Sequence, residues 1–268
     1  IQADVAISNK DQNTFSRVGN DENQGIAARL SLQQRIKLRE HIVSADSQKT
    51  QKSITNLLIG GHYEFVQDRF ETVEPYRPRE FQRDSTITSA QKTNEHLFSA
   101  KLGLENNRWG TMAYEFGGLL KDSLYSGLRH AFSADVRSHG FAFNALASYL
   151  SSASPEKSSQ FLRPRFDLSY SIKELSKLKL GFYFEQEQNK IKTIGLDTLN
   201  PASFYFNVFK VYAELPAKEG LMLKASALRR YDYFIKAQDF AKLTLADEVN
   251  FGGEWKSSKN SQLVWNLN

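Results

Sequence analysis

The sequence contains no cysteine, so it forms neither a disulfide framework nor a cysteine-based metal site. It also lacks any apolar run long enough for a membrane-spanning helix, and its mean hydropathy is only −0.50. Helical periodicity is nearly absent along the chain. The near absence of helical periodicity points to an all-β protein. These absences leave a transmembrane β-barrel open, because barrel strands alternate and keep a low mean hydropathy.

Clustered positive charge and catalytic motifs are missing as well. The net charge is +5, but lysine and arginine are spread along the whole chain, so we expect no nucleic-acid partner. The glycine pairs at 60–61, 117–118 and 252–253 are not followed by the Lys-Ser/Thr of a phosphate loop, and no serine lies in a nucleophile elbow. The sequence therefore predicts no enzyme, no metal site and no cofactor.

What the chain does contain is alternation of apolar and polar residues with a period of two. It predicts an antiparallel meander of about a dozen long strands in a single all-β unit covering 1–268, with no domain linker. Polar loops are expected at 10–24, 39–52 and 67–94, and a break at Gly252-Gly253. The clearest predicted strands are 1–9, 25–38, 53–67, 95–106, 108–118, 128–138, 141–152, 161–173, 177–190, 203–215, 221–234, 241–251 and 261–268.

Strand length then suggests a setting. Most predicted strands have about 10–13 residues, whereas ordinary globular strands have about five or six, and a strand tilted across a bilayer needs about 9–11. One face carries Leu, Phe, Ala, Ile and Tyr, and the other carries Lys, Arg, Glu, Gln and Ser. This favours an outer-membrane β-barrel or an arc of a larger barrel. A soluble β-sandwich or extended twisted sheet is the alternative, since residues 203–212 are apolar on both faces.

The segment 62–84 is the densest in opposite charges and supplies the candidate contact residues. Pro75 and Pro78 hold part of it extended. Ion pairing within a loop or a barrel interior is one interpretation, and contact with a glycan or a protein is another. A carbohydrate-active enzyme using its carboxylates is a third. The candidates for ligand or partner contact are Glu64, Arg69, Glu74, Tyr76, Arg77, Arg79 and Arg83.

The histidines give no metal-binding pattern, because none lies at ligand spacing from another histidine. His62 and Glu64 are two apart and therefore share one face of a strand, but two side chains alone do not make a metal site. Trp109, Trp255 and Trp265 lie near strand ends, where they are expected either at a membrane interface or in core packing.

The stretch Glu74–Asp84 resembles a part of very long, poorly characterised β-rich envelope proteins of Bacteroidota-type bacteria. The runs 129–138 and 263–267 have a similar character. The resemblance implies a location in the bacterial outer membrane or envelope, and it brings no functional residues with it. The chain begins at Ile1 and ends in a strand-like pattern, so we expect an internal fragment of a longer protein. Its expected partner is outer-membrane lipid, with other envelope proteins or glycan as further partners. A secreted, extracellular location is the alternative.

Overall fold

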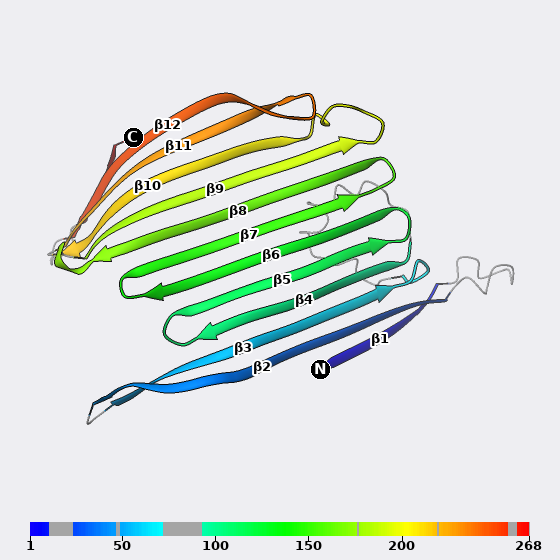
Figure 1. Ribbon diagram of the computed structural model, residues 1–268, viewed down its shortest axis with the longest axis horizontal. Helices are drawn as coiled ribbons and strands as arrows, with labels where there is room; N and C mark the ends of the chain where they lie inside the picture. Colours follow the sequence, from blue (N-terminus) through cyan, green and yellow to red (C-terminus); the bar gives the residue numbers. More distant parts are fainter. Residues whose placement is uncertain are drawn as a thin grey trace.

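A computed structural model describes residues 1–10, 24–46, 49–71, 93–175, 177–218, 220–256 and 262–267. They form one 13-stranded sheet in which neighbours in sequence are neighbours in space (Figure 1). The predicted antiparallel all-β meander is thus confirmed. The strands are β1 (Gln2–Asn9), β2 (Gln24–Asp46), β3 (Lys49–Val66), β4 (Glu95–Asn106), β5 (Gly110–Lys121), β6 (Tyr125–Ser138), β7 (Phe141–Ala153), β8 (Lys157–Ile172), β9 (Leu178–Thr193), β10 (Phe204–Lys218), β11 (Leu221–Lys236), β12 (Asp239–Lys256) and β13 (Gln262–Leu267).

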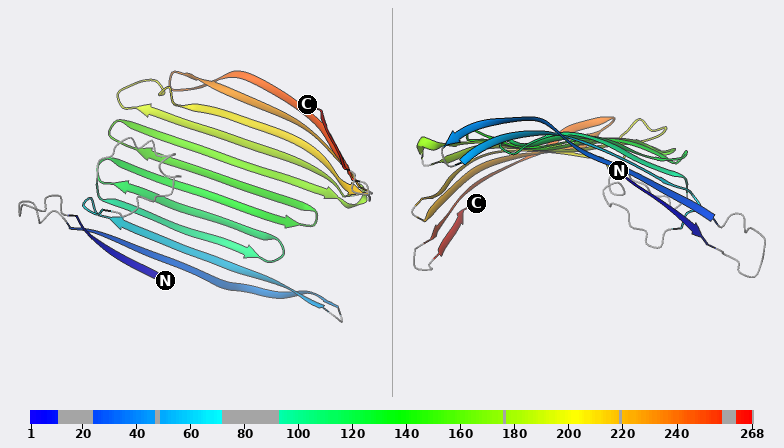
Figure 2. Two further views of the ribbon diagram at one scale, coloured as in Figure 1. Left: turned by 180° about the vertical axis from the view of Figure 1, so that it is seen from behind. Right: turned by 90° about the horizontal axis from the view of Figure 1, so that it is seen from below.

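The sheet is open, because β1 and β13 each pair with a single neighbour among the described strands. Seen from below, with the strands running across the view, the sheet is twisted and arched, and its N- and C-terminal ends lie on the same side of its middle (Figure 2, right). Within the described residues the only helix is a short 3-10 helix, η2 (Lys173–Leu175), in the connection between β8 and β9. No helix in the described part of the chain is both long enough and apolar enough to cross a membrane.

Two local expectations were wrong. The predicted loop 39–52 is a continuation of the β2–β3 hairpin, with β2 extending to Asp46 and β3 starting at Lys49. Register shifts between Lys37 and Arg39 and between Ile42 and Ser44 explain the error. Each shift is a bulge that changes which side chains share a face, and so it interrupts the period-two pattern that marks a strand.

The predicted break at Gly252-Gly253 is also wrong, since both glycines lie inside β12 and pair with β13. A Cβ on Gly253 would come within 2.3 Å of Cζ2 in the Trp265 ring. Glycine at this position therefore leaves the space that the indole occupies.

The register assigns every strand residue to one of two faces. One face carries most of the exposed large apolar side chains of the strands, such as Leu102, Leu168 and Val249, and we call it the convex face. The other carries most of the charged and hydroxyl side chains, and its residues line two hollows of the sheet. We call it the concave face. Along β8, Leu168 and Tyr170 on the convex face are exposed, whereas Ser159 and Ser169 on the concave face are buried.

The apolar part of the convex face is an oblique band. We take its upper limit at Phe65 in β3 and at Val249 in β12, where Asp247 interrupts the face before the exposed Leu245. Stepping from Val249 to its partner on each next strand in turn leads to Thr55 in β3. The residues on this path are Ala227, Val211, Phe182, Leu168, Phe143, Val136, Gly110 and Asn106.

Thr55 lies ten residues from Phe65 (65 − 55 = 10), and nine interstrand steps separate β3 from β12 (12 − 3 = 9). With about 3.3 Å per residue along a strand and about 4.8 Å between strands, the upper limit of the band is inclined by about 37° to a line perpendicular to the strands. In β8 it spans Leu162 to Ile172, ten residue steps or about 33 Å along the strand. The height of the band, measured perpendicular to its inclined upper limit, is therefore about 26 Å. The slope and the height agree with the strand tilt of about 35–45° and the apolar height of about 25 Å in transmembrane barrels.

The two ends of the sheet differ in their connections. At one end the strands are joined through 47–48, 107–109, 139–140, 173–177, 219–220 and 257–261; at the other, through 10–23, 67–94, 122–124, 154–156, 194–203 and 237–238. We call the second end, which has the three longest connections, the long-connection end. Bacterial outer-membrane barrels have the same asymmetry, with short turns on the periplasmic side and longer loops outside.

Candidate functional site

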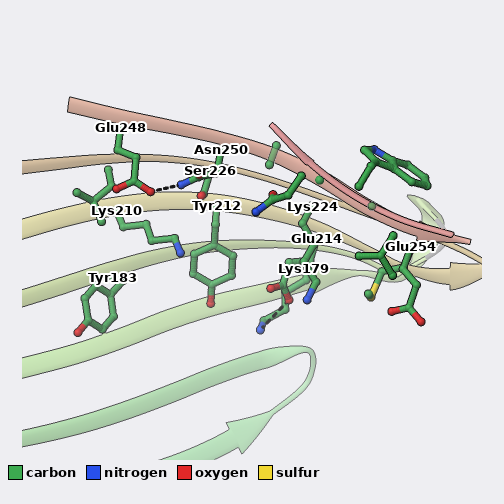
Figure 3. Close-up of a pocket in the computed structure, with 18 of the residues that line it drawn as sticks. Lys179, Tyr183, Lys210, Tyr212, Glu214, Lys224, Ser226, Glu248, Asn250 and Glu254 are labelled. Carbon is green, nitrogen blue, oxygen red and sulfur yellow. Dashed lines mark hydrogen bonds and ion pairs between the residues drawn. The ribbon is translucent and has the colours of Figure 1, made fainter. Parts of the chain in front are cut away.

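The larger hollow of the concave face, about 940 Å³, lies over β8–β13 (Figure 3). Alternation places every second side chain of β10, namely Lys210, Tyr212 and Glu214, on its floor. Lys224 and Ser226 from β11 continue the same polar face. The remaining lining residues include Asp167, Lys179, Tyr183, Glu248, Asn250, Glu254 and Asn266.

A hydrogen bond across three strands organises the hollow. The Tyr212 hydroxyl on β10 donates to Oδ1 of Asp167 on β8 at 2.6 Å. The Tyr212 ring crosses β9 at Gly181, the residue paired with Tyr212. Glycine has no Cβ, so the ring can pass over the strand at this position. A Cβ on Gly181 would lie 2.1 Å from Cζ of Tyr212, so this glycine is required by the close approach of the ring.

Charged pairs surround this bond. Lys179 lies opposite Glu214, with 3.4 Å between Nζ and Oε2, and its Nζ also lies 5.2 Å from the centroid of the Tyr212 ring. The Tyr183 hydroxyl donates to Oε2 of Glu185 at 2.6 Å. Both members of the Lys179–Glu214 pair are about one-third exposed, so water screens it and its contribution to stability is small.

The lining is a wall of mixed character, in which charged and hydrogen-bonding side chains lie beside the apolar Met222, Leu228, Val264 and Trp265. It contains three lysines, four carboxylates, two tyrosines and two asparagines, and no histidine or cysteine. Such a wall donates and accepts hydrogen bonds and carries charges of both signs. Within the described residues, no group of three or more His, Cys, Asp or Glu side chains is arranged to hold a metal ion.

The structure describes only two of the candidates from segment 62–84. Glu64 lies on the concave face of β3, and its Oε2 is 3.8 Å from Nε2 of His62, so the expected shared face is confirmed. Arg69 lies in the turn after β3, where it has interaction partners. Neither residue lines the hollow over β8–β13. Glu74, Tyr76, Arg77, Arg79 and Arg83 lie outside the described residues.

Sequence reasoning missed this hollow. The signal was the alternation of Lys210, Tyr212 and Glu214, three polar residues at every second position of β10. It was obscured by Phe204, Phe206 and Val208, which precede them on the same face and make the strand apolar on both sides. Of these three, Phe206 lies under the guanidinium of Arg230, with 4.3 Å between Cζ and the ring centroid, so even this part of the concave face is not uniformly apolar.

Comparison with known proteins assigns no family to the chain. No family model, no curated protein and no solved structure matches it.

Proposed function

We propose that this chain is the wall of a bacterial outer-membrane β-barrel, or an arc of a larger one, whose concave face lines a route for polar solutes. The observation that carries the proposal is the oblique apolar band of the convex face. An exposed apolar surface of this extent needs a covering medium. A slope of about 37° and a height of about 26 Å suit the hydrocarbon layer of a bilayer.

The concave face supports the second half of the proposal. Barrel interiors are polar where they enclose an aqueous channel, and the hollow over β8–β13 has both signs of charge with hydroxyl and amide groups between them. In this function the Tyr212–Asp167 bond and the Lys179–Glu214 pair hold the wall's side chains in place beside the solute. Passage of this kind needs no cofactor.

Closure is part of the proposal. The free edges of β1 and β13 carry unpaired backbone groups among the described strands, and such groups are costly in a bilayer. The barrel therefore requires further strands or further copies between these two edges. The number of these strands or copies is set by the requirement that the barrel closes.

Adjacent residues of β11 provide a matched test. Ser226 lines the concave hollow, and Ala227 lies on the convex face within the apolar band. The purified protein is reconstituted into planar bilayers as Ser226→Cys or Ala227→Cys, in a chain that has no other cysteine. A charged methanethiosulfonate reagent is expected to lower the conductance of the Ser226→Cys protein and to leave that of the Ala227→Cys protein unchanged. An equal response of both variants contradicts the proposal, and absence of conductance contradicts closure by further copies of this chain.

A further inference from the structure

Cationic side chains on the convex face gather in one place. In the regular parts of the described strands, and among side chains that the structure places, the lysines and arginines of this face are Arg39, Lys190, Lys192, Arg229 and Lys242. All but Arg39 lie on β9–β12, on the side of the apolar band that faces the long-connection end. A barrel that needed only solubility beyond the band would have no reason to confine these charges to one group of neighbouring strands.

Aromatic rings lie among the lysines. The register places Gln188, Tyr205, Tyr233 and Lys242 in one row across β9–β12. The rings of Tyr205 and Tyr233 are stacked, with 4.0 Å between centroids and 17° between planes, and Phe240 lies 5.7 Å from Tyr205. We call the group formed by Lys190, Lys192, Tyr205, Tyr231, Tyr233, Phe240 and Lys242 the tyrosine–lysine patch.

Direct contacts connect the lysines to these rings. Nζ of Lys242 lies 4.2 Å from the centroid of the Tyr231 ring, and Nζ of Lys190 lies 5.9 Å from that of Phe240. Below the rings, Nδ2 of the buried Asn207 donates to the Tyr205 hydroxyl at 3.1 Å. The aromatic platform is therefore held from beneath, with an ammonium group on each side.

The patch lies at the upper limit of the apolar band. In β12 the band ends at Val249, and the next convex residue, Asp247, forms a two-bond ion pair with Arg229 at 2.7 and 2.9 Å. The patch begins just beyond this pair. Tyrosine and lysine are the residues that transmembrane proteins place at head-group depth, where an apolar ring and a polar tip are both accommodated.

The patch also has an excess of positive charge. Asp247 neutralises Arg229, and Asp239 pairs with Lys190 at 2.9 Å. Nearby Glu248 lies on the concave face and does not reach the patch. Lys192 and Lys242 are exposed and take part in no ion pair within the described residues. The uncompensated charges suit an anion at the level of the head groups.

We infer that the tyrosine–lysine patch binds the anionic phosphate head group of a membrane lipid. Lys242 and Lys192, which take part in no ion pair within the described residues, contact the phosphate, while the Tyr205 and Tyr233 rings pack on the carbon skeleton beside it. The inference rests on the proposed function, because it requires the convex face to lie against lipid. It adds the class of lipid recognised and its place on the wall. Each lysine near an anionic surface contributes about fivefold in affinity.

The test measures phosphatidylglycerol bound to the purified protein in detergent by native mass spectrometry, for wild type, Lys242→Gln and Lys192→Gln/Lys242→Gln. The control is Lys101→Gln, which removes the same charge from the concave face, where Lys101 lies opposite Glu115. Affinity is expected to fall about fivefold in the single variant and about 25-fold in the double variant. The Lys101→Gln protein should bind as wild type does.

Two outcomes overturn the inference. In the first, the Lys242 and Lys101 variants bind phosphatidylglycerol equally. In the second, free glycerol phosphate displaces the lipid at equal concentration, which shows a simple anion site with no lipid contact. Flotation with phosphatidylcholine vesicles separates this failure from failure of the proposed function. If wild-type protein does not float with the vesicles, both the proposed function and the lipid inference are wrong. If it floats but shows no preference for phosphatidylglycerol, only the lipid inference is wrong.

Discussion

A single charge placed on the convex face distinguishes a lipid-facing wall from a sheet in water. Leu168 lies near the middle of the apolar band in β8, between its paired neighbours Phe143 and Phe182, and its side chain is 44% exposed. Leu168→Arg places a guanidinium close to the bilayer midplane, where arginine costs about 2–4 kcal/mol. In water the same change at a half-exposed leucine costs only about 1 kcal/mol of lost apolar contact.

The matched control is Gln160→Arg, on the same strand and face but eight residues away, beyond the upper limit of the band. Arginine near an interface costs about 0–1 kcal/mol. Guanidinium unfolding of the protein folded in lipid vesicles should therefore show Leu168→Arg to be less stable than Gln160→Arg by about 2–3 kcal/mol. If the two variants differ by less than about 1 kcal/mol, the band does not face hydrocarbon and the reasoning fails.

Three further predictions concern the hollow, a turn and the hairpin beyond the band. Gly181→Ala should lower the free energy of unfolding by about 1–2 kcal/mol, because its Cβ displaces Tyr212 from Asp167; the cost should vanish in a Tyr212→Ala background, and an equal cost there contradicts the account. Asn106→Ala should cost about 1–3 kcal/mol in the same assay, because the buried amide holds both Ser53 and the backbone of the β4–β5 turn. Hydrogen bonds and attraction from Lys37 and Lys52 hold the pKa of Glu40 at about 2, below its usual 4.5. Since the folded pKa is depressed, the pairing contributes fully above pH 4.5 and is lost as the pH falls toward 2; carboxyl-carbon NMR titration of Glu40 checks this, and a midpoint near 4.5 contradicts it.

Period-two alternation was sufficient to predict the strands where the ladder is regular. Residues 95–106 were predicted as a strand with the bounds that β4 has. In 39–52 two bulges moved side chains from one face to the other, and no local residue marks a bulge in advance. Gly252 and Gly253 were misread for a different reason. A Cβ on Gly253 would meet the Trp265 ring and one on Gly252 would meet Oδ1 of Asn266, and both are tertiary contacts with β13 that local sequence does not reveal.

The candidate site shows the same division between local and tertiary information. The shared face of His62 and Glu64 followed from their spacing, and the structure places them 3.8 Å apart. The Tyr212–Asp167 bond joins residues 45 positions apart and depends on Gly181 between them, so only the register of β8, β9 and β10 brings it into view. The density of charge along the chain pointed to 62–84, whereas the charged residues of the hollow are dispersed over the five strands β8–β12.

The most direct test of the central claim is the environment of each β8 side chain in a bilayer. Because the chain has no cysteine, spin labels can be introduced singly at every position from Phe161 to Ile172. Accessibility to dissolved oxygen and to a water-soluble nickel complex is then measured in vesicles. We predict a period of two, with oxygen favoured at Leu162, Phe166, Leu168 and Tyr170, and nickel favoured at Arg163, Arg165 and Ser169. Nickel access at both sets of positions would contradict the membrane-wall account.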